Sequence, residues 1–269
     1  MDKFKKLREI LKNMESLLVA YSGGVDSTFL LKSAFDTLGD RVLAVTAESD
    51  TYTAEELEDS RKIASDIGVR HIIIHTEELK NEKFVSNPPD RCYYCKKELF
   101  TKLLEIAKIN KINFVADGTN FDDINDYRPG MKAALEFGIR SPLKEAGFTK
   151  NEIREYSKKL GLSTWNKPGQ ACLSSRFPYG ENITPQKLGI VSSAENFLHE
   201  LGFSELRVRY YSPALARIEL NLHEQEKLYN SETRVKILTY FKKLGFNYIT
   251  LDLEGYRTGS MNEVLGYKT

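Results

Sequence analysis

The stretch LLVAYSGGVDS, residues 17–27, is an apolar run that ends in a glycine pair. The run 17–21 has the length and the continuous apolar character of a buried strand. A helical pattern resumes at about Asp26 and continues to Leu38, so the glycines lie in the turn between strand and helix. Glycine permits the positive φ angles and the close backbone approach that such a turn requires. The stretch therefore predicts a strand–turn–helix unit.

The turn Ser22-Gly23-Gly24-Val25-Asp26-Ser27 carries the groups of a phosphate-binding loop. The start of a helix offers unpaired N–H groups and a partial positive charge to an anion. Ser22 and Ser27 add hydroxyl donors, and Asp26 is placed to act through a bound Mg²⁺. A Walker A loop would need Gly-Lys-Ser/Thr, which is absent, so transfer of a γ-phosphate is disfavoured. A glycine turn with Asp26 as an ordinary helix-terminal residue is the alternative, and the full hexapeptide is more specific than that.

Strand and helix patterns alternate from residue 3 to residue 160. This alternation predicts an α/β domain with a parallel sheet. Thr149 and Glu152 have the spacing of a capping box at the start of its last helix. The expected strands are 17–21, 41–47, 69–75 and 113–118, and the expected helices are 3–15, 26–38, 55–67, 94–109, 130–137 and 150–160.

The pattern changes after residues 166–185, a proline-rich stretch that we interpret as a linker or lid. We also expect a mobile loop at 77–91, which is charged and holds two adjacent prolines. A small α+β domain follows the linker, so the expected division is a PP-loop ATP-binding domain at 1–180 and a substrate-binding domain at 181–269. Its expected elements are a helix at 185–201, strands at 205–211 and 215–220, a helix at 224–244 and a strand at 246–252.

The composition is that of a soluble globular protein, with 41% hydrophobic and 29% charged residues. Lys+Arg is 39 against Asp+Glu 38, so no overall field attracts nucleic acid or a membrane surface. Lys12 and Glu15 interrupt the basic amino terminus, which argues against a signal peptide. We therefore expect a cytoplasmic protein that acts on small molecules, without a nucleic-acid or membrane partner. We also expect a homo-oligomer, although composition does not determine this.

The hexapeptide resembles the PP-loop of ATP pyrophosphatases, a group that includes NAD synthetases, GMP synthetases and tRNA-thiolating enzymes. Asp117-Gly118-Thr119-Asn120 looks like the second nucleotide loop of that group, with an ordinary turn as the alternative. The resemblance implies that ATP is cleaved to AMP and pyrophosphate, and that AMP activates a carboxylate or carbonyl oxygen. It implies ATP and Mg²⁺ as cofactors and Asp26 and Ser27 as catalytic residues. The implied nucleotide-binding residues are Ser22, Gly23, Gly24, Val25, Asp26, Ser27, Gly118 and Thr119.

Longer stretches resemble the LarE family over nearly the whole chain. The resemblance implies a sulfur transferase in the biosynthesis of the nickel-pincer nucleotide. Its substrate would be pyridinium-3,5-dicarboxylate mononucleotide, whose carboxylates are adenylated and converted to thiocarboxylates. Activation is needed because a free carboxylate is a poor electrophile, and water must be kept from the activated acyl group. The matching stretches are Asp126-Tyr127-Arg128-Pro129-Gly130, Ser141-Pro142-Leu143, Trp165-Asn166-Lys167-Pro168, Ala171-Cys172-Leu173-Ser174-Ser175-Arg176, Arg207-Val208-Arg209 and Ala216-Arg217-Ile218-Glu219.

Three cysteines, Cys92, Cys95 and Cys172, bear on the source of sulfur. The resemblance implies two variants: one in which a single cysteine gives up its own sulfur, and one in which three cysteines hold a 4Fe-4S cluster. Three thiolates leave one iron open, where an exogenous sulfide can bind. We favour the cluster, with Cys172 also assigned to catalysis. The alternatives are Cys172 as a sacrificial donor, a Cys92–Cys95 redox pair, and a zinc site completed by His71 or His75.

The second domain offers a hairpin whose register can be predicted from its buried face. A three-residue loop, 212–214, pairs Tyr211 with Leu215 and keeps polar and apolar faces apart. It also pairs Arg209 with Arg217 and Arg207 with Glu219. The two opposed arginines would repel each other, and a bound phosphate would relieve the repulsion.

The LarE resemblance points to the same hairpin face for the phosphate of the substrate. Arg207, Arg209, Arg217 and Glu219 are therefore the implied substrate-binding residues, and a solvated basic face is the alternative. Glu195 corresponds by spacing to an acidic position of the family, and we assign it as a ligand of a divalent metal.

Two other functions compete with this interpretation. A tRNA-thiolating enzyme is one, because some of those enzymes also use three cysteines around a cluster; the balanced charge and the small second domain disfavour it. A nucleotide-binding regulator without chemistry is the other. Pyrophosphate release that depends on a carboxylate substrate would exclude the regulator.

Overall fold

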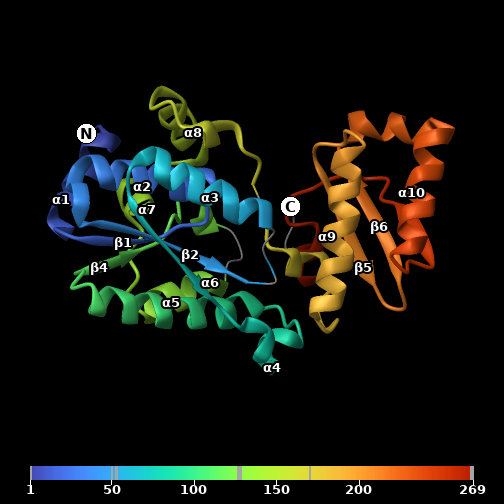
Figure 1. Ribbon diagram of the computed structural model, residues 1–269, viewed down its shortest axis with the longest axis horizontal. Coiled ribbons are helices and arrows are strands. Elements are labelled where there is room, and N and C mark those ends of the chain that lie inside the picture. The colour runs from blue at the N-terminus through green and yellow to red at the C-terminus, as the bar shows by residue number, and fades with distance from the viewer. Residues whose placement is uncertain (1, 50, 52–53, 126–128, 170, 267–269) are drawn as a thin grey trace. The chain divides into compact units, whose positions relative to one another are not determined.

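The computed structural model forms two compact units and describes residues 2–49, 51, 54–125, 129–169 and 171–266. One unit contains residues 1–78 and 90–170, and the other contains residues 79–89 and 171–269 (Figure 1). The second unit thus begins ten residues before the expected start at 181, and it takes in a segment that we expected to be a loop of the first domain. Asp126, Tyr127 and Arg128, part of one family-like stretch, lie outside the described residues.

The first unit contains a four-stranded sheet in the order β3-β2-β1-β4. Every neighbouring pair of strands in it is parallel, which confirms the α/β prediction. Because β2 and β4 lie on opposite sides of β1, the strand order reverses at β1, and ligands bind at such reversals, at the carboxyl ends of the strands. The strands are β1 (Leu17–Ala20), β2 (Val42–Glu48), β3 (Arg70–His75) and β4 (Phe114–Ala116).

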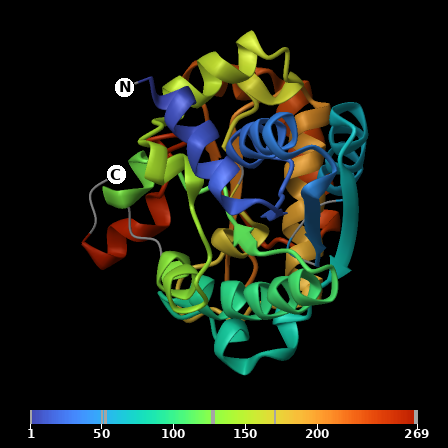
Figure 2. The same cartoon turned by 90° about the vertical axis from the view of Figure 1, so that its left-hand side faces the viewer.

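Helices cover both faces of this sheet (Figures 1 and 2). Alternate residues of β1 supply the two cores, since Leu17 and Val19 pack in one cluster and Leu18 in the other. The capping box of Thr149 and Glu152 is confirmed. One face carries α1 (Lys3–Met14), α2 (Val25–Leu38), α3 (Ala54–Ile67), α7 (Pro142–Ala146) and α8 (Lys150–Lys159), and the other carries α5 (Arg91–Ile109) and α6 (Pro129–Glu136).

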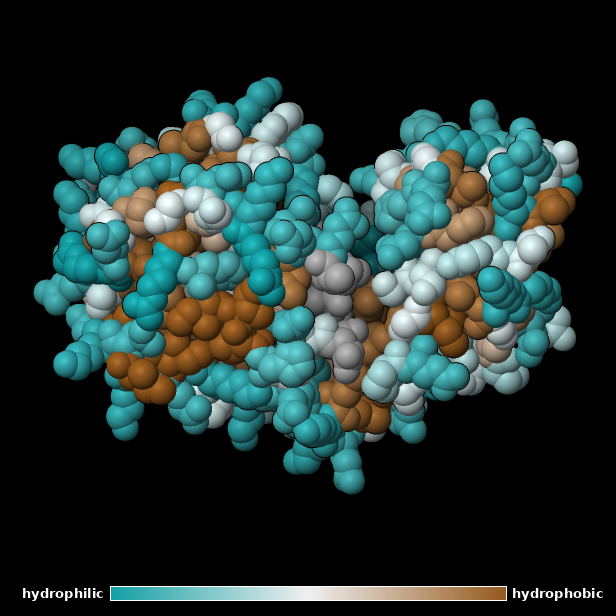
Figure 3. All heavy atoms as spheres, viewed as in Figure 1, coloured by the Kyte–Doolittle hydropathy of each residue, from teal (hydrophilic) through white to brown (hydrophobic). Residues whose placement is uncertain are grey.

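An apolar area is visible on the lower part of the first unit (Figure 3), the side on which α5 lies in Figure 1. Ile72 and Ile74 of the edge strand β3 are only partly buried, as is Ile106 of α5. Ile109, at the end of that helix, is 78% exposed. In the homo-oligomer that we expect, a second copy of the chain would bury this apolar surface. The oligomeric state stays a prediction.

The second unit contains a three-stranded sheet in the order β5-β6-β7, with strands β5 (Leu206–Tyr211), β6 (Leu215–Leu220) and β7 (Tyr248–Leu251). β5 and β6 form the hairpin in the predicted register: Tyr211 lies opposite Leu215, Arg209 opposite Arg217 and Arg207 opposite Glu219. Helices α9 (Pro185–Glu200) and α10 (Ser231–Lys243) add Leu198 and Phe241 to its core.

The expected helix 224–244 is divided in two, with a 3-10 segment at Leu222–Tyr229 followed by α10. The side chain of Asn230 accepts the backbone N–H groups of Glu232 and Thr233. Asn230 therefore caps a new helix at this point, which a continuous helix would not allow.

The expected mobile loop at 77–91 contains a helix, α4 (Glu82–Val85), and packs within the second unit. Phe84 and Asn87 are buried, and the Asn87 amide donates to the carbonyl oxygens of Phe177 and Pro178. The backbone N–H of Ile183 donates to Val85 O. These long-range contacts order the segment, so its interpretation as a mobile loop is wrong.

The expected linker at 166–185 is likewise packed into the second unit from residue 171 onward. Leu173–Arg176 forms a 3-10 turn in which Ser174 and Arg176 are buried.

No helix of the described residues is long and apolar enough to cross a membrane.

Candidate functional site

The phosphate-binding loop lies at the carboxyl end of β1, where α2 begins. Gly24 is the N-cap of α2 in extended conformation, and no side chain caps the helix. The first N–H groups of α2 are therefore available to an anion. Gly23 has a φ of 70°, and a Cβ atom there would lie 3.2 Å from the Cβ of Ser60 on α3. Both the turn and the tight packing thus require glycine at position 23.

The two serines of the loop bond to each other. The Ser27 hydroxyl donates to Gly24 O at 3.2 Å and lies 3.1 Å from the Ser22 hydroxyl. It also accepts the Ser22 backbone N–H at 3.3 Å. Because one hydroxyl joins both ends of the turn, Ser27 holds the loop in shape as well as offering an oxygen to a ligand.

Asp26, in the first turn of α2, is not isolated. Its Oδ2 lies 2.5 Å from the Nζ of Lys150 on α8, and its Oδ1 accepts a long hydrogen bond of 3.5 Å from the Asn120 amide. Lys150 was not among the residues selected from the sequence. A lysine at the first position of a helix opposes the helix dipole, and that is the signal that could have identified it.

The second loop follows β4 and is held by Asp117. The carboxylate of Asp117 accepts the backbone N–H and the hydroxyl of Thr119 at 3.1 and 2.9 Å, and the Ser141 hydroxyl at 2.8 Å. A Cβ atom on Gly118 would lie 2.9 Å from the Ser27 nitrogen. The loop after β4 therefore packs directly against the phosphate-binding loop, and the fold brings the two expected nucleotide loops together.

Two family-like stretches lie near these loops. Ser141, the first residue of one, donates to Asp117. Lys167, from the other, forms an ion pair of 3.0 Å with Asp59, whose neighbour Ser60 packs against Gly23. Arg154 of α8 fixes this second stretch by donating to the carbonyl oxygens of Trp165 and Lys167.

The three cysteines are divided between the units. Cys92 and Cys95 lie one turn apart near the start of α5, which begins three residues earlier than expected. Cys172 precedes the 3-10 turn Leu173–Arg176 of the second unit. None of the three is in a disulfide, and all three are of intermediate exposure. Within the part of the chain that the structure describes, no group of three or more His, Cys, Asp or Glu side chains is arranged to hold a metal ion.

The histidines of the zinc alternative have other contacts. The His71 ring lies 2.8 Å from the Thr46 hydroxyl and packs edge-on against Tyr21. Burial lowers the pKa of His71, and the charge of Arg61 lowers it further. His75 is exposed and lies 3.4 Å from Glu48. Neither contact involves a cysteine.

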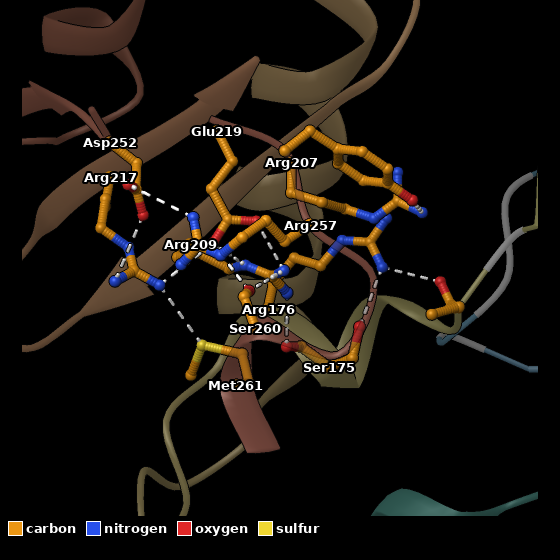
Figure 4. Close-up of polar contacts among 12 residues, drawn as sticks. Ser175, Arg176, Arg207, Arg209, Arg217, Glu219, Asp252, Arg257, Ser260 and Met261 are labelled. Atoms are coloured by element: carbon orange, nitrogen blue, oxygen red, sulfur yellow. Dashed lines mark hydrogen bonds and ion pairs between the residues drawn. The ribbon is translucent and has the colours of Figure 1, made fainter. Parts of the chain in front are cut away.

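The predicted hairpin face of the second unit carries a network of arginines (Figure 4). Arg209 makes a two-point contact with Glu219 at 3.0 and 2.7 Å, and Arg217 reaches the same carboxylate at 3.0 Å. Ser260 joins the pair through its hydroxyl. The fully buried Glu219 therefore relieves the repulsion between the opposed arginines. The bound phosphate that we expected to relieve this repulsion stays a prediction.

Glu195, the expected metal ligand, is buried against Arg176. The guanidinium donates to both carboxylate oxygens at 2.9 and 2.8 Å, and the Val208 N–H donates to one of them at 2.9 Å. Burial works to raise the pKa of Glu195, but the charge of Arg176 outweighs it and holds the pKa below its ordinary value. In this structure Glu195 neutralises a buried arginine.

Arg176 in turn holds the backbone beside Cys172. Its Nη1 donates to the carbonyl oxygens of Ala171 and Cys172 at 2.7 and 3.2 Å. Arg176 was quoted from the sequence only as part of a family-like stretch, without a role. The local sequence gives no sign of its partner Glu195, which lies 19 positions away.

Arg207 packs on the face of the Tyr256 ring, with 5.0 Å between guanidinium carbon and ring centroid. Its burial, with the nearby charge of Arg176, lowers the pKa of Arg207. The cluster comprises five arginines and the five carboxylates that lie beside them, so its formal charges balance. They are Arg176, Arg207, Arg209, Arg217 and Arg257, and Glu195, Glu219, Asp252, Glu254 and Glu263. Guanidinium groups are the donors that bind a phosphate monoester best.

A family profile described as queuosine biosynthesis protein QueC matches residues 16–87 of the chain. The matched part contains the phosphate-binding loop and the strands β1, β2 and β3.

Relatives match over much more of the chain. It is 41% identical to the pyridinium-3,5-bisthiocarboxylic acid mononucleotide synthase of Lactiplantibacillus plantarum, over 95% of this chain and 92% of that protein. It is 46% identical to an uncharacterized protein of Synechocystis over 98% of both chains. The similarity to the tRNA-specific 2-thiouridylase of Halothermothrix orenii is weaker, at 25% identity over 58% of this chain and 54% of that protein.

Proposed function

This chain belongs to the LarE family, that of the pyridinium-3,5-bisthiocarboxylic acid mononucleotide synthase, and from this we propose its reaction. It adenylates the carboxylates of pyridinium-3,5-dicarboxylate mononucleotide with ATP and converts them to thiocarboxylates. A carboxylate oxygen attacks the α-phosphorus of ATP, the bond to the β-phosphate breaks, and pyrophosphate leaves. Sulfide sulfur then attacks the acyl carbon, and AMP leaves with the former carboxylate oxygen.

The observation that carries the proposal is the contact between the two nucleotide loops, Gly118 against Ser27. The N–H groups at the start of α2 and the hydroxyls of Ser22 and Ser27 would bind the phosphates. Asp26 fits a Mg²⁺ site, because Mg²⁺ is usually held by one or two carboxylates together with substrate phosphates. When bound, Mg²⁺ would neutralise the charge of the phosphates.

The arginine network of the second unit supports a phosphorylated substrate. Arg207 packs on the Tyr256 ring and Arg217 on the Tyr211 ring, and guanidinium groups held in this way are suited to bind a phosphate. We assign Arg207, Arg209, Arg217 and Glu219 to the binding of the substrate phosphate, with Glu219 acting through the two arginines that it aligns.

For the sulfur source we propose a 4Fe-4S cluster held by Cys92, Cys95 and Cys172. The thiols suit this role because none is in a disulfide and all three are partly accessible, and because Cys92 and Cys95 lie on one face of α5. A cluster with three protein ligands would supply sulfide from its open iron. Cys172 as a sacrificial donor remains the alternative within the same family.

The tRNA-thiolating alternative has less support. Similarity to the tRNA-specific enzyme covers 58% of the chain at 25% identity, against 95% at 41% for the mononucleotide synthase. The balance of 39 basic and 38 acidic residues also gives no overall attraction to tRNA.

The proposal is tested by measuring pyrophosphate release from ATP with and without the dicarboxylate nucleotide. We expect release only when that nucleotide is present. Replacing Ser27 by alanine removes the hydroxyl that joins Ser22 to Gly24, so we expect a loss of about tenfold or more in kcat/KM, since each hydrogen bond contributes about 0.5–1.5 kcal/mol. Ser33→Ala is the matched control, because Ser33 is buried on the same helix and its hydroxyl has no partner. Formation of ADP and phosphate, or release without the carboxylate substrate, would contradict adenylation.

A further inference from the structure

Residues 257–266, which we call the C-terminal cap, lie against the arginine network of the second unit (Figure 4). The Ser260 hydroxyl accepts a hydrogen bond from Arg209 Nη2 at 2.9 Å. The sulfur of Met261 lies 3.6 Å from Arg217 Nη2. The cap therefore contacts two of the arginines to which we assign the substrate phosphate.

The chain is fixed to the sheet just before the cap. The Tyr256 N–H donates to Leu220 O at 2.8 Å, and a Cβ atom on Gly255 would lie 2.7 Å from the same oxygen, so this close contact requires glycine. The contacts that hold the cap to the arginine network are made by side chains, so the cap can leave without breaking the sheet. Its described backbone hydrogen bonds join its own residues: Ser260 to Arg257, Asn262 to Gly259 and Gly266 to Glu263.

Two donors converge on the sulfur of Met261. Besides Arg217, the Tyr211 hydroxyl lies 3.9 Å from it. The guanidinium carbon of Arg217 lies 5.4 Å from the centroid of the Tyr211 ring, so the two donors are held side by side. A thioether is a weak acceptor, whereas a phosphate oxygen forms short, charge-assisted hydrogen bonds with a guanidinium. A phosphate that reached these donors would therefore displace the sulfur.

We propose that the C-terminal cap closes the substrate-phosphate site while it is empty, and that a bound phosphate displaces Met261 from Tyr211 and Arg217. The inference rests on the proposed function for the identity of the ligand and adds a movable segment to it. Departure of the cap leaves no buried charge without a partner on the hairpin, because the two-point contact between Arg209 and Glu219 does not involve the cap.

The cap then competes with the ligand. The apparent affinity of a site that is open for only part of the time is reduced by the open fraction. Removing the side chain of Met261 should therefore tighten the binding of a phosphate. A cap that only supports the arginines would have the opposite effect, because its loss would leave them less well positioned.

The methyl signals of the methionines report whether Met261 moves. Labelling with methyl-¹³C-methionine gives a signal for each of the four methionines, and that of Met261 is the one missing from Met261→Leu. We expect inorganic phosphate and the dicarboxylate mononucleotide each to shift this signal when they are titrated into the full chain. The signal of Met14, which is buried in the core of the first unit, is the internal control and should stay in place.

Equilibrium dialysis of the same two ligands measures the competition. Met261→Ala should bind each of them about threefold or more tightly than the wild type. Tyr211→Phe, which lacks the hydroxyl donor, should bind each of them about threefold or more weakly. Val264→Ala is the matched control, because Val264 lies in the same cap but is 77% exposed, and it should bind both ligands as the wild type does.

The outcomes separate the cap from the proposed function. Binding of a ligand that leaves the Met261 signal in place would overturn the cap, and so would equal or weaker binding by Met261→Ala. If phosphate shifts the signal and the mononucleotide does not bind, the cap stands and the proposed substrate is refuted. If neither ligand binds to the wild type or to Met261→Ala, both proposals fail.

Discussion

Glu195, which we expect to be a metal ligand, forms a buried ion pair in the structure. The family resemblance marks its position as acidic, and an acidic residue near a substrate site suggests a metal ligand. In the structure its two oxygens are taken up by Arg176 and a backbone N–H. A buried carboxylate and guanidinium require each other, because either one alone would be an uncompensated charge.

We expect the Glu195–Arg176 pair to make the free energy of unfolding depend on pH in the acidic range. The pKa of Glu195 is lower in the folded chain than in the unfolded chain, where it is about 4.3. Its contribution to stability is therefore fully present above about pH 4.3 and is lost as the pH falls through the lower folded value. Glu195→Gln should lower the free energy of unfolding at pH 7 by about 3 kcal/mol or more and make the acid limb of the stability profile shallower.

Urea unfolding between pH 3 and 7 measures both effects. Glu200→Gln, an exposed position on the same helix, is the control and should follow the wild type. Parallel pH profiles for Glu195→Gln and the wild type would show that the carboxylate does not carry this dependence. A variant that loses divalent-metal binding but keeps normal acid stability would support the metal-ligand assignment, which stays a prediction.

Some contacts of single residues could not be predicted from the local sequence. The positive φ of Gly23 follows from its place in the turn, but the contact of Gly118 with Ser27 depends on how β4 lies next to β1. Lys150 and Asp26 are separated by 124 positions, and no local pattern connects them. Contacts of this kind follow from the fold and not from spacing along the chain.

The β5–β6 hairpin was predictable in detail because side chains alternate between the two faces of a strand. Shifting the register by one residue would expose Val208 and Ile218, which are buried. The segment 79–89 was not predictable in this way. Its order comes from Phe84 and Asn87 packing against residues near 180, and its charged, proline-containing sequence resembles a surface loop.

The hairpin leads to a prediction about the substrate phosphate. Arg207 is half-buried on Tyr256, so its guanidinium is held in place before a ligand arrives. We expect Arg207→Ala to raise KM for the mononucleotide by roughly tenfold or more, since a charge-assisted hydrogen bond contributes about 1.5–3 kcal/mol. The KM for the corresponding nucleoside, which lacks the phosphate, should stay within about twofold of the wild-type value.

Steady-state pyrophosphate release, measured with the nucleotide and with the nucleoside, gives the KM of the wild type and of Arg207→Ala for each substrate. Arg234→Ala, an exposed position on α10, serves as the control. Equal increases in KM for nucleotide and nucleoside would show that Arg207 supports the site without contacting the phosphate. A wild-type KM for both would remove the hairpin face from the substrate site.

The whole chain divides its expected chemistry between two units. The nucleotide loops, Lys150, Cys92 and Cys95 belong to one, and the arginine network and Cys172 belong to the other. A cluster ligated by all three cysteines would therefore need thiols from both units. Sacrifice of Cys172 requires only a thiol of the second unit, so the two sulfur chemistries make different demands on the whole molecule.

Replacing each cysteine by alanine separates these chemistries. If the three thiols hold a 4Fe-4S cluster, Cys92→Ala, Cys95→Ala and Cys172→Ala should each remove most of the iron from anaerobically purified protein and most of the thiocarboxylate product. Thr101→Ala, an exposed position on α5, should keep both. The cluster form should also exceed one turnover per chain when sulfide is supplied, because its sulfur comes from outside the protein.

The masses of the chains after reaction provide the opposing test. A sacrificial Cys172 would lose its sulfur as the acyl group takes it, and the chain would become lighter by about one H₂S and stop after one turnover. Cys92→Ala and Cys95→Ala would then keep full single-turnover activity, since neither thiol takes part. That outcome, with dehydroalanine at position 172, would overturn the cluster. Ligand number favours the opposite result: three thiolates leave one iron of a 4Fe-4S centre open for sulfide, whereas sacrifice gives no role to the two cysteines that share a face of α5.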